Sequence, residues 1–230
     1  GYLSASASIT VKNHKTTLSA SLPQAVFCDF GVIGAAPPRL RKGGLGDSLA
    51  RPTAQADWLL SHLLLNSKYD ERPFELLADI EPELFDNAGG IAKNDPQTVT
   101  ALIKLLLLSG LGMTIAGGSY PASQGEHIIA HAYNMLKHTS DKIKVKGEFH
   151  TLHGEEIGIT TLYMAKLQAK LLNGKAKFRT EQLDESYITN LFGGELAQDF
   201  KQVFAKKLAL ISNAPSAKWD EIRGKIEQVM

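Results

Sequence analysis

Three segments of the chain combine glycine with side chains that can bind a metal ion or transfer a proton. Residues 43–47 read Gly-Gly-Leu-Gly-Asp, residues 117–127 run from two glycines to His127, and residues 150–158 contain His153. Taken alone, each has an ordinary structural explanation, since Asp47 could be the N-cap of a helix and the histidines could be structural or solvent-facing. Together, one carboxylate and two imidazoles supply three ligands and leave one coordination position open, which is typical of a catalytic metal site.

The separations between these candidate ligands favour a site assembled from several helices, since they are too long for a zinc finger. His131 follows His127 by one helical turn, so the two histidines are expected to share one face of a helix. We expect Zn²⁺ by default, with Ni²⁺ as the alternative, because nitrogen and oxygen ligands suit several divalent ions. Such an ion could polarise a carbonyl or an alcohol oxygen.

The elements that position these residues are predicted to be mostly helical. Near the N-terminus, Ser6–Val11 and residues 16–20 predict a hairpin, and residues 25–27 predict a third short strand. Beyond the prolines at 37 and 38, apolar residues recur at helical spacing. These runs fall in residues 54–66, 99–108, 162–172, 200–211 and 219–229.

The same patterns divide the chain into two parts. Residues 1–36 form a β segment, and residues 37–230 form a helical domain of about seven to nine helices. One helix should begin at Pro96, since Asn94 and Asp95 precede it. A hairpin and one strand cannot bury a core alone, so we expect these strands to belong to a sheet whose remainder is absent.

The composition argues against several classes of function. The net charge is +1, from 25 Lys and Arg against 24 Asp and Glu, which gives no basis for binding nucleic acid or an anionic membrane. The single Cys28 excludes an internal disulfide and favours a reducing, cytoplasmic compartment. The longest apolar stretch is interrupted by Lys104, so no membrane span is expected. The first four residues lack the features of a signal sequence and read as a cut end.

The three glycine-containing segments resemble motifs of the sn-glycerol-1-phosphate dehydrogenase family, in the wider group of iron-containing alcohol dehydrogenases and dehydroquinate synthases. Residues 44–47 and 53–58 are similar to the motifs A/S-G-x-G-D and T-A-x-x-D-W. Residues 118–131 are similar to G-x-S-R-P-A-S-G-x-E-H-x-x-x-H, and residues 153–162 to H-G-x-x-V-G-x-x-T-L. The resemblance extends over about residues 37–172.

The resemblance implies a mainly α fold, in which a dehydroquinate synthase-like C-terminal helical domain follows a short β remnant of an N-terminal Rossmann-like domain. It implies an NAD- or NADP-dependent oxidoreductase of phospholipid metabolism that reduces dihydroxyacetone phosphate to sn-glycerol 1-phosphate. This chain would be a C-terminal portion of that enzyme, inactive alone. The expected partner is a small-molecule substrate, with a homo-oligomer as a further possibility and no nucleic acid or membrane.

The resemblance also assigns roles to individual residues. It implies that Asp47, His127 and His153 hold the metal and that His131 is a catalytic residue. It implies substrate binding by Ser119 and Ser123 and cofactor binding by Ser4.

The sequence departs from the family pattern in two ways. No glycine-rich dinucleotide fingerprint follows a predicted strand. In addition, Tyr120 stands where the motif usually carries Arg, which removes a bidentate anion binder, and Gln124 is inserted in the same loop. Two alternatives therefore stay open: a cyclase similar to 3-dehydroquinate synthase, and a non-enzymatic helical binding domain that retains the motifs. The residues at the motif positions favour the dehydrogenase.

Overall fold

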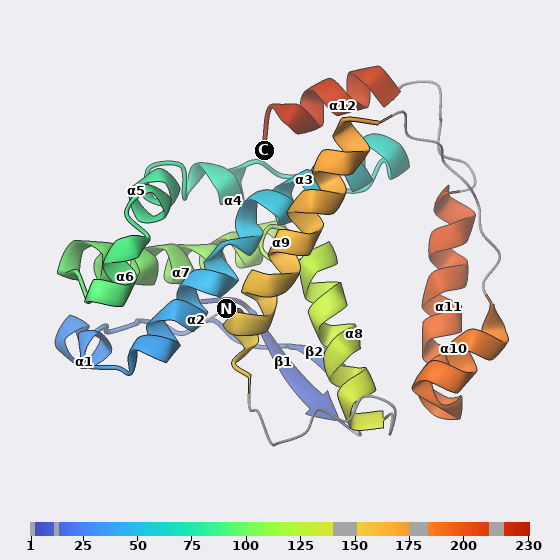
Figure 1. Ribbon diagram of the computed structural model, residues 1–230, viewed down its shortest axis with the longest axis horizontal. Coiled ribbons are helices and arrows are strands. Elements are labelled where there is room, and N and C mark those ends of the chain that lie inside the picture. Colours follow the sequence, from blue (N-terminus) through green and yellow to red (C-terminus); the bar gives the residue numbers. More distant parts are fainter. Residues whose placement is uncertain (1–2, 12–13, 140–150, 175–183, 212–218) are drawn as a thin grey trace.

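The chain folds into a β-hairpin followed by a series of helices (Figure 1). The computed structural model describes residues 3–11, 14–139, 151–174, 184–211 and 219–230. Strands β1 (Ser6–Val11) and β2 (His14–Ser19) pair antiparallel, with Ser6 opposite Ser19 and Val11 opposite His14. The fold is mainly α with a short β segment, as predicted, and the hairpin is confirmed.

The third predicted strand, at residues 25–27, is wrong. Residues 25–29 have no regular secondary structure, and the side chain of Phe27 is 95% exposed. A run with β propensity becomes a strand only where a neighbouring strand pairs with it, and the described sheet contains β1 and β2 alone. The chain then enters α1 (Phe30–Gly34), whose N-cap Asp29 accepts hydrogen bonds from the backbone N–H groups of Gly31 and Val32.

Helices α2 and α3 follow almost without a break. Helix α2 (Pro38–Ser48) begins with proline at its first position, where a missing N–H costs nothing. Helix α3 (Ala50–Leu65) ends at Asn66, which adopts the left-handed conformation at φ 53°. The predicted helix over residues 54–66 is therefore confirmed, and it begins four residues earlier than expected.

Three short helices precede the long central helix. They are α4 (Arg72–Glu75), α5 (Ile80–Asp86) and α6 (Gly89–Lys93). The expectation of seven to nine helices was too low, because the described part of residues 38–230 contains α2 to α12. Helices of four to seven residues are too short to show a clear apolar period.

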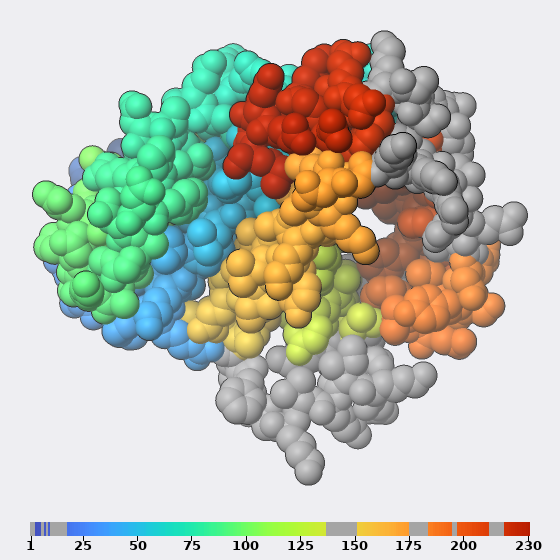
Figure 2. All heavy atoms as spheres, turned by 45° about the horizontal axis from the view of Figure 1, so that its top comes forward, coloured from blue at the N-terminus to red at the C-terminus, as the bar shows by residue number. Residues whose placement is uncertain are grey.

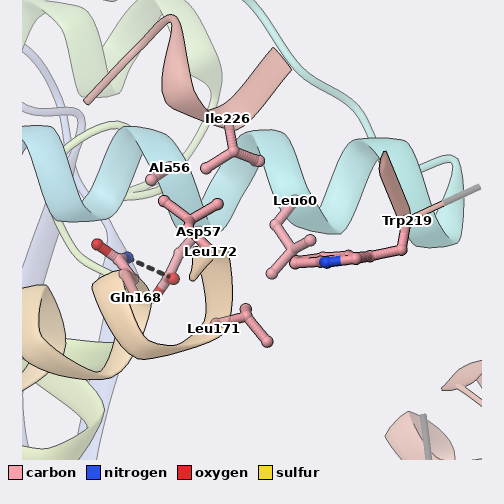
Figure 3. A pocket seen from close by; sticks show the side chains of 8 residues that line it. All are labelled: Ala56, Asp57, Leu60, Gln168, Leu171, Leu172, Trp219 and Ile226. Carbon is pink, nitrogen blue, oxygen red and sulfur yellow. Dashed lines mark hydrogen bonds between the residues drawn. The ribbon is translucent and has the colours of Figure 1, made fainter. Parts of the chain in front are cut away.

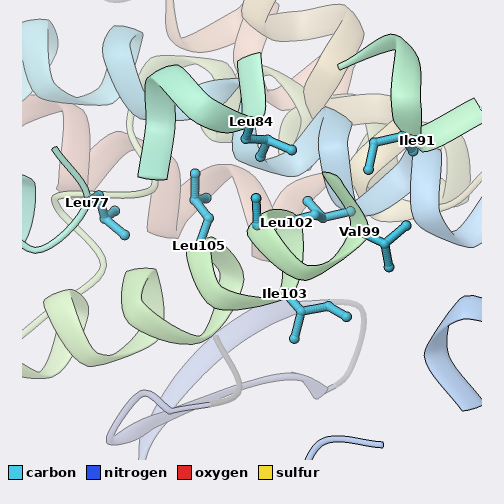
Figure 4. Close-up of a cluster of buried hydrophobic side chains, with 8 residues drawn as sticks. Leu77, Leu84, Ile91, Val99, Leu102, Ile103 and Leu105 are labelled. Carbon is cyan, nitrogen blue, oxygen red and sulfur yellow. The ribbon is translucent and has the colours of Figure 1, made fainter. Parts of the chain in front are cut away.

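The central helix α7 (Pro96–Ala116) forms the core of the N-terminal half. It begins as predicted, with Asp95 as N-cap accepting a 2.8 Å hydrogen bond from the backbone N–H of Thr98. Figure 4 shows Leu102 and Leu105 on the side of α7 that faces Leu84 of α5, whereas Ile103 points to the opposite side. The cluster consists of Leu77, Leu84, Ile91, Val99, Ala101, Leu102, Ile103 and Leu105.

The length of helix α7 differs from the expectation that no apolar stretch is long enough to span a membrane. Its 21 residues are long and apolar enough to cross a membrane by length and composition, whereas the sequence suggested a stretch that is too short. The single charge of Lys104 does not interrupt the helix, which continues to Ala116. Because its apolar residues pack against α4, α5 and α2, the helix has the surroundings of a core helix in a globular domain.

The C-terminal half contains the remaining helices. They are α8 (Gly125–Thr139), α9 (His153–Leu172), α10 (Glu185–Phe192), α11 (Gly194–Ile211) and α12 (Trp219–Glu227). Helix α9 crosses α2 and runs beside α8, and α12 packs on α3 (Figure 1). Helices α10 and α11 pair with each other and lie beside the α8–α9 layer (Figure 2). The helices predicted within residues 162–172, 200–211 and 219–229 are all present.

Candidate metal centre

Helices α2 and α9 cross at glycines that allow their backbones to touch. A Cβ on Gly46 would collide with the carbonyl oxygen of Gly154, and a Cβ on Gly154 would collide with the backbone carbonyl of Gly43. A Cβ on Gly158 would lie only 3.2 Å from the Cα of Gly46. Larger side chains at these positions would push the helices apart, so glycine sets their separation.

This crossing places two of the predicted ligands side by side. Asp47 follows Gly46 in the last turn of α2, and His153 precedes Gly154 at the start of α9. The carboxylate oxygen Oδ1 of Asp47 lies 3.7 Å from Nε2 of His153. The alternative that Asp47 is the N-cap of a helix is excluded, because Asp47 lies inside α2, and the glycines before it serve the contact of α2 with α9.

The third predicted ligand comes from helix α8. His127 lies in its first turn, with Nε2 3.5 Å from Oδ1 of Asp47. One ligand atom from each of Asp47, His127 and His153 lies within 4.8 Å of the other two. Ligands about 2.0–2.2 Å from a tetrahedral ion are roughly 3.4 Å apart, so a divalent ion would need only small movements of these side chains.

The carboxylate of Asp47 provides the test of whether a metal fits. Its Oδ1 is buried and makes no hydrogen bond with any described residue, although two imidazole nitrogens face it. A buried carboxylate oxygen that accepts no hydrogen bond is costly. A divalent cation would satisfy it, and one carboxylate with two imidazoles is a donor set that zinc and similar ions accept.

A buried glutamate that the sequence interpretation did not select stands behind His127. Glu126 is fully buried, and its Oε1 lies 2.9 Å from Nδ1 of His127. The backbone N–H of Gln124 donates to the same oxygen at 2.8 Å. The signal for it in the sequence is an acidic residue directly before a candidate ligand.

The charges of this group reinforce one another. Burial alone would raise the pKa values of Asp47 and Glu126, but other groups together outweigh it and lower both. His127 acts on both carboxylates, His153 adds to its effect on Asp47, and the backbone N–H of Gln124 adds to its effect on Glu126. Burial alone would lower the pKa of His127, but the two carboxylates outweigh it and raise that pKa. The site therefore holds two ionised carboxylates around one imidazole, an environment that favours a cation.

His131 belongs to the same histidine cluster. Its ring centroid lies 5.9 Å from that of His127 and 5.8 Å from that of His153, on which it stacks at 23°. It is one turn beyond His127 on the same face of α8, as the spacing predicted. It is not among the three residues whose ligand atoms converge.

A cavity of about 700 Å³ opens beside the ligands, which is within the usual range for a small-molecule site. Asp47 and His153 lie in its wall together with Cys28, Arg41 and apolar side chains of α7 such as Leu106. Among the described residues that line it, Arg41 is the only lysine or arginine. Its Nη1 donates to the carbonyl oxygens of Gly34 and Ala36, and its buried Nε has no described partner.

The predicted substrate and cofactor serines lie elsewhere. Ser119 and Ser123 are in the connection before α8, and Ser4 is buried near α7. None of these three described residues lines the cavity. In the same connection Tyr120 stacks on Trp58 of α3, with ring centroids 5.7 Å apart.

A buried polar contact holds the start of α8 in place. Asp57 of α3 accepts a hydrogen bond from Nε2 of Gln168 at 2.8 Å (Figure 3). It accepts a second from the backbone N–H of Gly125 at 3.1 Å. Gln168 also donates to the carbonyl of Thr53, so α3, α8 and α9 are tied together. Burial raises the pKa of Asp57 despite these bonds. The adjacent gap, about 10 Å³ and lined mostly by apolar side chains, is too small for a ligand.

The sequence is similar to several curated proteins named glycerol-1-phosphate dehydrogenase (NAD(P)+), and no protein-family profile matches it. It is 38% identical to the protein of Thermococcus kodakarensis over 73% of this chain and 45% of that protein. It is 30% identical to the protein of Methanococcoides burtonii over 92% of this chain and 63% of that protein. It is 31% identical to the protein of Methanosphaera stadtmanae over 80% of this chain and 53% of that protein. The chain thus spans about half the length of the curated relatives it matches.

Proposed function

Because this chain belongs to the glycerol-1-phosphate dehydrogenase family, we propose that it supplies the metal-binding site of an NAD(P)-dependent dehydrogenase. The proposed reaction reduces the ketone of dihydroxyacetone phosphate to the secondary alcohol of sn-glycerol 1-phosphate. The observation that carries the proposal is the convergence of Asp47, His127 and His153 on one buried carboxylate oxygen that lacks a hydrogen bond. A cyclase is disfavoured, since the relatives reported above are all named dehydrogenases.

The residues of the site have two roles in the proposed reaction, metal binding and proton donation. A divalent ion held by Asp47, His127 and His153 would supply polarisation of the substrate carbonyl. The reduction transfers a hydride from the nicotinamide to the carbonyl carbon and needs one proton on the oxygen. His131, stacked on His153, is the side chain that we propose supplies this proton.

The cavity beside the ligands supports a small anionic substrate. Its volume of about 700 Å³ exceeds what a three-carbon phosphate needs, so there is room for a second molecule such as the nicotinamide. Tyr120 cannot replace the bidentate Arg of the family motif, because a phenol carries no positive charge. Arg41 lines the cavity and is the residue that we propose compensates for this loss. The substrate roles of Ser119 and Ser123 stay part of the proposal.

The cofactor part of the proposal concerns a region beyond the helical domain. Residues 1–36 are proposed to be a remnant of a nucleotide-binding domain, with Ser4 as a cofactor contact and residues 37–230 as the metal-binding domain. We therefore expect this chain to be inactive alone, because the sequence lacks the glycine-rich phosphate-binding turn. The single free Cys28 is consistent with a cytoplasmic location.

Metal content tests the proposal. The chain is purified without chelators and analysed by inductively coupled plasma mass spectrometry, which also distinguishes zinc from nickel. We expect up to one divalent ion per chain, and loss of that ion in the His127→Ala, His153→Ala double variant. His62→Ala is the matched control, since His62 bonds to the carbonyl of Ser67 outside the site. Stoichiometric metal in the double variant would show that the ligands are misassigned.

A further inference from the structure

Glu126 is a buried charged residue to which the proposed reaction assigns no role. It is fully buried and lies in the first turn of α8, directly before the candidate ligand His127. A carboxylate is seldom fully buried without a partner, because burial removes its hydration. Its contacts therefore indicate what it does.

The contact with His127 fixes the protonation pattern of that ring. An ionised carboxylate only accepts hydrogen bonds, so at 2.9 Å the Nδ1 of His127 must carry the hydrogen and donate it to Oε1 of Glu126. In the neutral ring the other nitrogen, Nε2, then keeps its lone pair. That nitrogen faces Oδ1 of Asp47 at 3.5 Å, where the ligand atoms converge.

Glu126 is itself held from two sides. The backbone N–H of Gln124 donates to its Oε1 at 2.8 Å, which leaves little freedom for this oxygen to turn away from His127. On the other side, the hydroxyl of Thr53 lies 3.3 Å from Oε2 and 2.9 Å from the carbonyl oxygen of Ala50. A hydroxyl has one hydrogen, so Thr53 can donate to only one of these acceptors at a time.

From these contacts we infer that Glu126 is a positioning residue of the metal site. It orients His127, holds it in the tautomer that presents Nε2, and adds a buried negative charge beside the ligands. Carboxylates that accept the second N–H of a ligating histidine typically change metal affinity about 10- to 100-fold. The inference rests on the proposed metal site and assigns to it a residue that does not touch the ion.

Two substitutions separate the hydrogen bond from the charge. In Glu126→Gln the amide oxygen can keep both bonds on the Oε1 side, while the amide nitrogen faces the Thr53 oxygen. This variant therefore loses the charge but keeps an acceptor for His127. Glu126→Met loses both. Glu83→Gln is the control, since Glu83 is an exposed carboxylate of α5.

The test measures Zn²⁺ affinity by competition with a chromophoric chelator and the His127 tautomer by long-range ¹H–¹⁵N NMR. We expect about 10-fold weaker binding in Glu126→Gln and about 100-fold in Glu126→Met, with the control unchanged. We expect the Nδ1–H tautomer to persist in Glu126→Gln and to be lost in Glu126→Met. Circular dichroism shows whether each variant is folded, and if Glu126→Met does not fold, the affinity of Glu126→Gln decides.

The outcomes distinguish this inference from the proposed function. If folded variants bind Zn²⁺ as tightly as the unsubstituted chain, while His127→Ala abolishes binding, the metal site stands and the role of Glu126 is wrong. If the unsubstituted chain binds no Zn²⁺, both proposals are overturned. A purely structural role would destabilise the fold without moving the tautomer, and that result would also overturn the inference.

Discussion

Gly46 of α2 and Gly154 of α9 lie in backbone contact, and each is the sequence neighbour of a candidate metal ligand. This contact brings together Asp47 and His153, whose Oδ1 and Nε2 atoms lie 3.7 Å apart. The geometry of the site therefore depends on the absence of side chains at the helix crossing.

The substitution Gly154→Ala should destabilise the fold and weaken metal binding. Its Cβ would meet the backbone of Gly43, which cannot move away as a flexible side chain could. Overpacking of this kind costs about 1–3 kcal/mol of unfolding free energy. Gly224→Ala in α12 is the control, since its Cβ would enter open space and a helical alanine should stabilise by about 0.5–1 kcal/mol. Urea denaturation measures the unfolding free energy of both variants. If Gly154→Ala changed it no more unfavourably than Gly224→Ala, the helix crossing would tolerate a side chain.

The histidines should differ in their effect on metal content. His153→Ala should release the ion, because its Nε2 is one of the converging ligand atoms. His131→Ala should retain it, because His131 is outside that group although its ring stacks on His153. Elemental analysis of the two single variants checks this. Loss of metal in His131→Ala with retention in His153→Ala would exchange the two roles.

The unfolding free energy should fall in acid because protonation of Glu155 breaks its ion pair with Arg39. Both guanidinium bonds, at 2.6 and 2.7 Å, together with the backbone N–H of Leu152, lower the pKa of Glu155 from 4.5 to about 2. A lowered carboxyl pKa stabilises the fold above the unfolded value, and this contribution is lost as the pH falls from about 4.5 towards 2.

The variant Glu155→Gln tests this contribution. It should lose less unfolding free energy between pH 5 and pH 2.5 than the unsubstituted chain, as measured by urea denaturation at each pH. The difference should be small, because the ion pair is partly exposed. Glu83→Gln, which removes an exposed carboxylate from α5, should behave like the unsubstituted chain. Parallel pH profiles for Glu155→Gln and the unsubstituted chain would contradict the prediction.

The chain should bind NAD(H) and NADP(H) only weakly. Residues 4–30 lack the glycine-rich turn that cradles the pyrophosphate of a dinucleotide. Calorimetric titration of the metal-loaded chain should therefore give no micromolar affinity for either cofactor. A micromolar dissociation constant would mean that the helical domain carries the cofactor site itself.

Much of the fold followed from local patterns in the sequence. The apolar period at Val99, Leu102 and Leu106 predicted the core of α7, and the Asp95-Pro96 pair predicted its start. The prediction of a third strand was wrong because β propensity does not show whether a neighbouring strand is present to pair with residues 25–27.

The site was harder to predict in detail than in outline. The sequence led us to Asp47, His127 and His153, but it did not show that the glycines before Asp47 lie inside a helix. Glycine is compatible with a turn and with a close helix crossing, and only the position of α9 distinguishes the two. Glu126 was overlooked for a related reason, since its importance depends on being buried against His127.

X-ray absorption fine structure of the Zn²⁺-loaded chain tests the central claim most directly. Coordination by Asp47, His127 and His153 predicts a first shell of nitrogen and oxygen atoms at about 2.0–2.2 Å, with the outer-shell scattering of two imidazoles. His127→Ala, which lacks one of the three ligands, should not give this spectrum at Zn²⁺ concentrations that load the unsubstituted chain. A sulfur atom at about 2.3 Å, which only Cys28 or a methionine could supply, or a shell without imidazole, would contradict the account.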